Sequence, residues 1–180
     1  ERFGVGRGEG VSMLFVGSLP AGVRGGGFLY TNRDSLSIGV VLQPESCITG
    51  GVSTVDALEA FTGHPAVRRL LRGGTRLEYA AHLVPESGVD GIPPLYTDGL
   101  MLAGDAAGLV LNTGLAIEGM RYAIASGMAA GETAVEAIRR GDFSRRGLSA
   151  YADRLEAGGV LGDFRRFRHV PDLLRNPRLH

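Results

Sequence analysis

Apolar residues in the first quarter of the chain recur with the period of a β-strand. They stand at every second position from Leu36 to Leu42, and shorter apolar runs cover 13–16 and 28–31. This period is typical of strands with one buried face. Asn32-Arg33-Asp34 lies between two of these runs and predicts a hairpin turn. We therefore expect an antiparallel sheet within residues 1–52.

The pattern then changes to that of helices. Ser53 or Thr54 can cap a helix that runs to about residue 72, with a break around Gly63-His64-Pro65. After it, alternating apolar residues predict a strand over 76–83. The loop 85–94, rich in Pro and Gly, is the best candidate for a domain boundary.

The second half begins with a short run of continuous apolar residues. Leu100-Met101-Leu102-Ala103 is typical of a fully buried parallel strand. After a loop over 104–114, a helix of roughly two dozen residues should end near Arg140, with Gly141 as its C-terminal cap. Ser144 can cap a further helix to about residue 156, and the chain beyond Gly158 is expected to be partly helical.

Composition narrows the class of protein. The 180 residues suit one domain or slightly more, and 44% hydrophobic with 21% charged residues is an ordinary globular balance. The 19 basic residues, all Arg, equal the 19 acidic ones, so nucleic acid is not an expected partner. We expect a cytoplasmic protein, with peripheral contact to the inner face of the membrane left open. Cys47 alone cannot ligate an iron-sulfur cluster.

Candidate chemistry lies in Gly104-Asp105-Ala106-Ala107-Gly108, where the predicted strand gives way to the long helix. Ligands of open α/β sheets bind at the carboxyl ends of strands. There Asp105 can accept hydrogen bonds from the ribityl or ribose hydroxyls of a nucleotide, and Gly104 lets the backbone approach them. The alternative, that Asp105 only caps a turn, is about as well supported by these residues alone.

The next segment leads into the N-terminus of the long helix, whose free N–H groups and dipole suit an anionic or electron-rich ligand. A reduced flavin is such a ligand. Its candidate contacts in this segment are Asn112, Gly114, Ile117, Glu118 and Gly119. Small residues recur along the same helix at 119, 123, 127, 131 and 134, which predicts close packing, with contact to a cofactor as the alternative.

Taken in order, several strings resemble the FixC family, which is related to electron-transfer-flavoprotein:quinone oxidoreductase and to geranylgeranyl reductases. They are Gly25-Gly26-Gly27-Phe28-Leu29-Tyr30-Thr31-Asn32-Arg33-Asp34, His64-Pro65, Tyr79-Ala80-Ala81-His82 with Glu86, Gly104–Gly108 and Ala123–Ala130. The resemblance implies FAD in a glutathione-reductase-like fold, oxidation of an electron-transfer flavoprotein, and delivery of electrons to quinone or a ferredoxin-like protein. It also places Gly25 and Gly26 at a quinone pocket, where a tight strand entry is the alternative reason for glycine.

The resemblance gives an α/β protein in three parts. Residues 1–95 form a sheet-rich domain on the substrate or quinone side, 96–141 the strand, loop and long helix of an FAD domain, and 142–180 a helical C-terminal segment. The Gly-x-Gly-x-x-Gly turn of the family is missing. We therefore expect a C-terminal fragment that binds FAD poorly alone, with no catalytic side chain and no metal. The alternative is a non-catalytic binding or assembly module.

Overall fold

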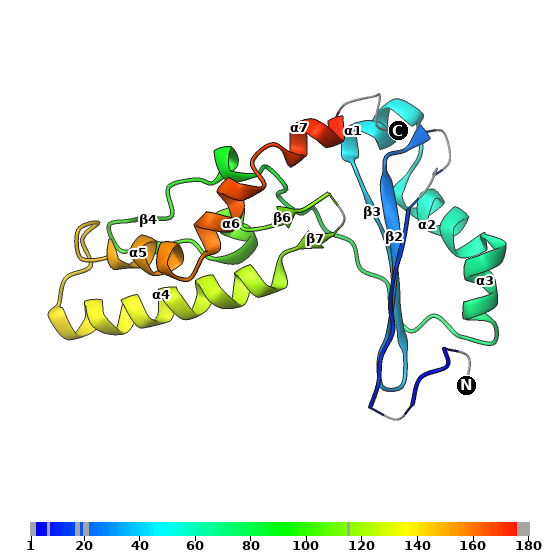
Figure 1. Ribbon diagram of the computed structural model, residues 1–180, viewed down its shortest axis with the longest axis horizontal. Coiled ribbons are helices and arrows are strands. Elements are labelled where there is room, and N and C mark those ends of the chain that lie inside the picture. Colours follow the sequence, from blue (N-terminus) through cyan, green and yellow to red (C-terminus); the bar gives the residue numbers. More distant parts are fainter. Residues whose placement is uncertain (1–2, 7, 17–18, 20–21, 115, 176–180) are drawn as a thin grey trace. The chain divides into compact units, whose positions relative to one another are not determined.

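A computed structural model describes residues 3–6, 8–16, 19, 22–114 and 116–175 (Figure 1). It is 44% helical and 16% strand, and its strands pair in small antiparallel sheets. This mixture agrees with the expected α/β class. The chain divides into two compact units, Glu1–Tyr79 and Ala80–His180, and each is described by itself.

The first unit contains one antiparallel sheet in the order β1 (Ser12–Phe15), β2 (Gly25–Thr31) and β3 (Leu36–Leu42). The predicted turn is confirmed, because Asn32 N–H donates to the carbonyl oxygen of Ser35 at 2.9 Å. Aromatic rings lie directly over glycines of this sheet. A Cβ at Gly27 would stand 2.3 Å from the ring of Phe61, so only glycine fits beneath it.

Three helices follow the sheet: α1 (Pro44–Gly50), α2 (Thr54–Gly63) and α3 (Pro65–Leu71). The predicted cap of α2 is confirmed, since Ser53 and Asp56 form a reciprocal capping box. The predicted break at 63–65 is confirmed as well. His64 Nδ1 accepts the N–H of Ala66 at 3.3 Å and so caps α3. We expected only sheet before residue 53, and α1 was missed.

The strand expected over 76–83 is wrong for the described structure. Residues 74–88 form an extended segment without regular hydrogen bonding, and Leu77 and Leu83 are 79% and 84% exposed. The alternation of apolar residues is real, but a strand also needs a neighbour to accept its backbone hydrogen bonds. No strand of the described residues pairs with this segment.

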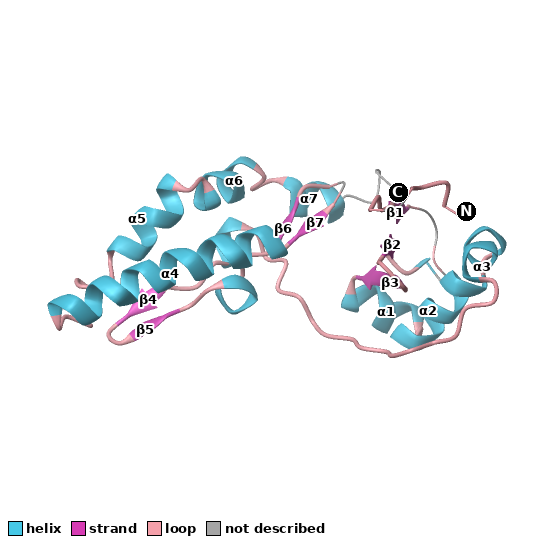
Figure 2. Ribbon diagram, turned by 90° about the horizontal axis from the view of Figure 1, so that it is seen from below, coloured by secondary structure: helices cyan, strands magenta, loops and turns pink. Residues whose placement is uncertain are grey.

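The second unit is built around one long helix, α4 (Met120–Arg140), with α5 (Ala150–Ala157) and α6 (Val160–Arg166) beside it (Figures 1 and 2). Two hairpins complete the unit, β4 (Tyr96–Thr97) with β5 (Leu100–Met101) and β6 (Leu111–Asn112) with β7 (Ile117–Glu118). Three short helices are η2 (Val89–Gly91), η3 (Gly104–Ala107) and α7 (Val170–Arg175). The core includes Leu109, Leu111, Tyr122, Tyr151, Leu155 and Phe164.

The expected parallel strand at 100–103 is also wrong. Its first two residues form β5, which pairs antiparallel with β4 across a turn at Gly99, where φ is 71°. Leu100 is 51% exposed, so the run is not buried on both faces. Within the described residues no other strand lies beside it, and a parallel arrangement needs such a neighbour.

The end of α4 is as expected. Gly141 adopts the left-handed conformation with φ 63°, and its N–H closes the last turn onto Ala137 and Ile138. Ser144, in contrast, does not cap α5. Its Oγ accepts the N–H of Gly147 at 3.1 Å and stabilises a turn before that helix. The predicted helices beyond Gly158 are confirmed as α6 and α7.

Close packing at the small residues of α4 is seen at its first turn. A Cβ at Gly104 would lie 3.2 Å from the Cβ of Ala123, and one at Gly119 would lie 3.5 Å from Val110. Added Cβ atoms at Gly127 and Gly131 would meet nothing within 4 Å among the described residues. The prediction of a closely packed small-residue face is therefore wrong for these two positions.

Candidate functional site

The Gly104–Asp105 turn is fastened to the start of α4. The N–H of Gly104 donates to Oγ of Ser126 at 2.9 Å, in a buried environment. Gly104 has φ 56°, a conformation that favours glycine, and little room remains between it and Ala123. Gly104 and Ala107 are buried, whereas Asp105 and Ala106 face outward. Packing thus fixes the turn and presents two of its residues to solvent.

Asp105 lies beside the N-terminus of α4. Its Oδ1 is 3.8 Å from the position that a Cβ on Gly119 would occupy, and Gly119 begins the helix without a side-chain cap. The turn itself is closed by backbone bonds from Gly108 and Leu109 to the carbonyl oxygens of Asp105 and Gly104. No hydrogen bond or ion pair to the Asp105 carboxylate occurs among the described residues. The side chain therefore does not close the turn.

The hairpin of β6 and β7 holds two further candidates. Asn112 Oδ1 accepts the N–H of Gly114 at 2.8 Å, and its Nδ2 donates to Oε1 of Glu86. Gly114 has φ 87°, so glycine is required by the turn itself. Ile117 is paired with Asn112 and is 39% exposed. The polar groups of Asn112 thus serve the hairpin in this structure.

Glu118 is held by an ion pair, 2.6 Å from its Oε2 to Nε of Arg121. Arg121 also contacts Asp163 of α6 at 3.1 Å, and the Tyr122 hydroxyl donates to the same Asp163 oxygen at 3.1 Å. Burial, helped by that hydrogen bond, raises the pKa of Tyr122 to about 12. Glu118 and Asp163 therefore share one guanidinium, that of Arg121.

Sequence reasoning missed Arg121, Tyr122 and Asp163. The sequence did contain a signal for Arg121. Glu118 and Arg121 stand three residues apart where the helix begins, and at this spacing oppositely charged side chains can form an ion pair. Asp163 is more than 40 residues away in sequence, and no local pattern links it to Tyr122. The network joins the start of α4 to α6.

The predicted residues of the second unit thus lie on adjoining elements. Gly104, Asp105 and Ala106 belong to η3, Asn112 to β6, Ile117 and Glu118 to β7, and Gly119 caps α4. The structure brings Asp105 and Gly119 together.

Gly25 and Gly26 belong to β2 of the first unit, where a Cβ at Gly25 would stand 2.1 Å from the carbonyl oxygen of Val41. Strand packing alone accounts for glycine at 25, and the quinone contact stays a prediction.

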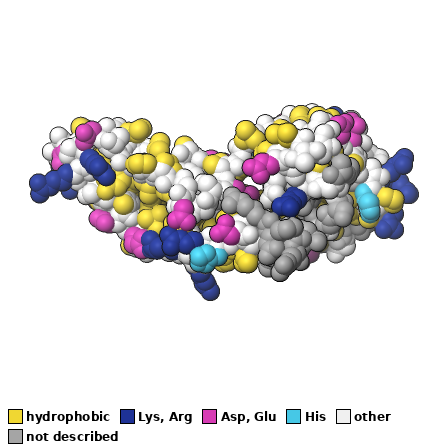
Figure 3. Space-filling model, turned by 90° about the horizontal axis from the view of Figure 1, so that it is seen from above, with side chains coloured by type: hydrophobic (Ala, Val, Ile, Leu, Met, Phe, Trp, Pro, Cys, Tyr) yellow, Lys and Arg dark blue, Asp and Glu magenta, His cyan; other side chains and the backbone are white. Residues whose placement is uncertain are grey.

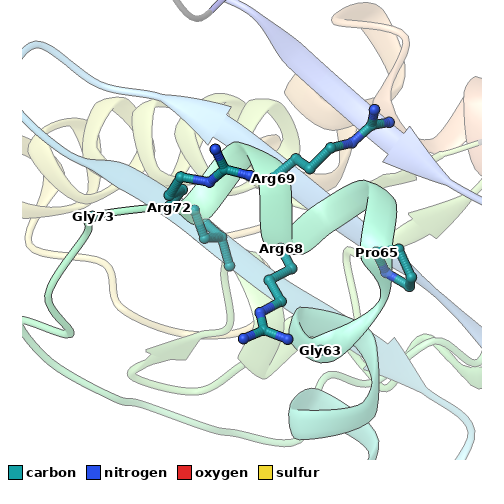
Figure 4. Close-up of a pocket in the computed structure, with 7 residues that line it drawn as sticks. Gly63, Pro65, Arg68, Arg69, Arg72 and Gly73 are labelled. Atoms are coloured by element: carbon teal, nitrogen blue, oxygen red, sulfur yellow. The ribbon is translucent and has the colours of Figure 1, made fainter.

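A separate hollow of about 760 Å³ lies on α3, and none of the candidate residues lines it. Arg68, Arg69 and Arg72 line it, together with Gly63, Pro65 and Gly73 (Figure 4). The three guanidinium groups point in different directions in this view and do not converge on one point. An anion site needs cationic groups that converge on one position, and this arrangement does not provide them.

Two features are absent from the described residues. No group of three or more His, Cys, Asp or Glu side chains is placed to hold a metal ion in that part of the chain. No helix there is long and apolar enough to cross a membrane.

Comparison with known proteins identifies relatives along nearly the whole chain. No family model matches. A probable electron transfer flavoprotein-quinone oxidoreductase of Escherichia coli, YdiS, is 46% identical over 179 residues, and protein FixC of the same organism is 44% identical over the same length. Over nearly its whole length the chain is thus similar to FixC and to a probable electron transfer flavoprotein-quinone oxidoreductase. YgcN, a third Escherichia coli protein, is 36% identical over 178 residues.

These similarities confirm the resemblance drawn from the sequence, and the names of the relatives support an electron-transfer oxidoreductase family. The aligned region covers 99% of this chain but 42% of YdiS and of FixC. The chain therefore spans less than half the length of these relatives. A region of this extent fits the expected C-terminal fragment of a larger flavoprotein.

Proposed function

We propose that this chain is the flavin-contacting C-terminal part of an FAD-dependent oxidoreductase. The observation that carries the proposal is the Asp105 carboxylate, which lies beside the uncapped N-terminus of α4 and has no protein partner among the described residues. An exposed carboxylate next to free backbone N–H groups is suited to a ligand that carries hydroxyls and an electron-rich ring. FAD has both.

The residues of the site would bind and orient that cofactor. Asp105 would accept hydrogen bonds from its hydroxyls, and the backbone at Gly104 and Ala106 would allow close approach. The N–H groups at the start of α4, behind Gly119, would stabilise negative charge on the reduced ring. Bound FAD would supply the redox chemistry, and the protein would supply position and electrostatics.

Glu118 has an indirect role in this proposal. Its carboxylate is paired with Arg121, which offsets part of the negative charge that Glu118 brings near an electron-rich ring. Asn112 and Gly114 shape the hairpin that precedes the helix. These three residues position the site, whereas Asp105 and the helix N-terminus contact the cofactor.

The names of the relatives support the proposed electron donor and electron acceptor of the complete protein. YdiS is named as a probable electron transfer flavoprotein-quinone oxidoreductase, and so is YgcN. We propose that the complete protein accepts electrons from an electron-transfer flavoprotein and passes them to a quinone. A ferredoxin-like acceptor and peripheral contact with the membrane remain predictions from the sequence.

The test is the affinity of the complete polypeptide for FAD after Asp105→Ala. Loss of a hydrogen bond to a charged group should weaken binding by about 1.5–3 kcal/mol, which is roughly 10- to 150-fold. Asp153→Ala, at an exposed carboxylate on α5, serves as the matched control and should leave the affinity unchanged. Equal affinity in wild type and Asp105→Ala, measured by titration calorimetry, would remove Asp105 from the site. A complete polypeptide that binds no FAD would favour the non-catalytic module.

A further inference from the structure

Three arginines of the first unit carry positive charge that no neighbour offsets. Arg68, Arg69 and Arg72 are exposed at α3, and their guanidinium groups form no ion pair or hydrogen bond with any described residue. No acidic residue occurs from 60 to 77, although acidic and basic residues balance over the whole chain. Figure 3 shows arginine side chains gathered at the edge of the first unit where α3 lies in Figure 1. We call these three side chains the α3 arginine surface.

This concentration of charge is unfavourable for the helix itself. Arg72 follows Arg68 by four positions and Arg69 by three, and like charges at these spacings repel on a helix. The helix dipole favours cations in the last turn, where Arg68 and Arg69 already lie. A third arginine adds repulsion that no carboxylate of the described structure relieves. The packing of the first unit therefore does not account for all three charges.

The geometry of the α3 arginine surface favours a broad ligand. Its guanidinium groups point in different directions, so one small anion cannot contact all three (Figure 4). A protein surface that carries several carboxylates can pair with each guanidinium separately, and arginine forms strong bidentate pairs with carboxylates. The arrangement thus fits an acidic protein surface better than a phosphate or a single carboxylate.

The apolar side chains of α3 do not take part in this surface. Val67 is 1% exposed, and Leu70 and Leu71 are half-buried. A helix that lies on a membrane combines basic residues with exposed apolar ones, and a permanent protein interface is apolar at its centre. Helix α3 presents neither. Charged contact without an apolar centre is suited to a short-lived complex, in which complementary charge guides the encounter.

We propose that the α3 arginine surface docks an acidic surface of a second protein, and that this protein is the electron-transfer flavoprotein of the proposed function. An electron donor must bind and leave in every cycle, and electron-transfer encounters have small interfaces. Complementary charge speeds such encounters without holding the proteins together. The identity of the partner rests on the proposed function, whereas the surface rests on the charge, exposure and geometry of α3.

The experiment measures how fast purified electron-transfer flavoprotein from the same organism associates with the complete polypeptide, by biolayer interferometry at low ionic strength. In one variant every arginine of the α3 arginine surface is changed to Gln. The matched control, Arg139→Gln with Arg145→Gln and Arg146→Gln, removes the same charge from exposed positions of the second unit. We expect the α3 variant to associate at least about tenfold more slowly than wild type, and the control to stay close to wild type.

Two further measurements separate charge from folding. A variant with Lys at the three positions keeps the charge and should retain most of the association rate. Added salt should slow wild type more steeply than the Gln variant, because it screens the charges that guide the encounter. The melting temperature and the FAD content should be the same in all variants, so a slower association cannot be attributed to a lost fold or a lost cofactor.

Several outcomes would overturn the proposal. Equal association rates of wild type and the α3 variant would remove α3 from the interface and leave the proposed function standing. An equal loss in the control would show an effect of net charge alone. Binding to vesicles of phosphatidylcholine and phosphatidylglycerol that the α3 variant loses, without any change in its association with the flavoprotein, would assign the surface to a membrane. A complete polypeptide that holds FAD but binds no electron-transfer flavoprotein would overturn both the surface and the proposed donor.

Discussion

The N–H of Gly104 and the Oγ of Ser126 are joined by a buried hydrogen bond of 2.9 Å, although the two residues are 22 positions apart. The same Oγ donates to the carbonyl oxygen of Tyr122 at 2.6 Å. One hydroxyl therefore connects the turn that presents Asp105 with the second turn of α4. The position of the candidate flavin contact therefore depends on a side chain that is itself fully buried.

Replacement of Ser126 tests this connection. Ser126→Ala leaves the buried N–H of Gly104 without its acceptor, which should lower the free energy of unfolding by about 1–3 kcal/mol. Ser149→Ala removes a comparable but exposed bond to the carbonyl oxygen of Arg146 and should cost less than about 0.5 kcal/mol. Urea denaturation of both variants gives the comparison. Similar losses of unfolding free energy in the two variants would mean that the buried hydrogen bond stabilises the fold no more than the exposed one.

Two glycines allow the cost of a strained backbone to be measured separately from the cost of steric crowding. Gly104 and Gly141 have nearly the same φ, 56° and 63°, but only Gly104 has a neighbour close to where a Cβ would stand. Gly141→Ala should therefore cost about 1–2 kcal/mol from the left-handed conformation alone. Gly104→Ala should cost measurably more, because the new methyl group lies 3.2 Å from the Cβ of Ala123. Equal unfolding free energies for the two variants would show that the turn can shift away from α4.

Local patterns predicted the helices well. The capping box at Ser53, the break at Pro65 and the cap at Gly141 each depend on residues within a few positions of one another. The missed helix α1 also carries a local signal, with Pro44 in its first turn and Gly51 in the left-handed conformation after its last residue. The alternating apolar residues over 36–42 led us to predict only sheet up to residue 52, so this signal was not used.

Strands were predicted less well because a strand depends on its partner. The alternation over 76–83 and the apolar run at 100–103 are both strand-like, yet the first has no partner among the described residues and the second pairs with β4. The site shows the same limit. The composition of the Gly104–Gly108 turn is readable in sequence, whereas the contacts of Asp163 with Arg121 and Tyr122 arise only when α6 packs on α4.

The Tyr122 hydroxyl gives a prediction about alkaline pH. Its pKa is raised from 10.0 to about 12 by burial first and by the hydrogen bond to Asp163 second. Between these values the unfolded chain has lost the Tyr122 proton while the folded chain keeps it. Because the folded state then binds more protons, stability must fall as pH rises through this window. The contribution is complete below pH 10 and is lost by about pH 12.

Tyr122→Phe removes this titration. The free energy of unfolding of the variant should fall less steeply than that of wild type between pH 10 and about 12, by a difference on the order of 2 kcal/mol across the window. Some slope should remain in the variant, because burial also raises the pKa of Tyr151. Asp163→Asn, which keeps the ring but removes the carboxylate acceptor, should give an intermediate slope. Urea denaturation at several alkaline pH values measures all three, and parallel curves for wild type and Tyr122→Phe would show that the hydroxyl titrates alike in the folded and unfolded chains.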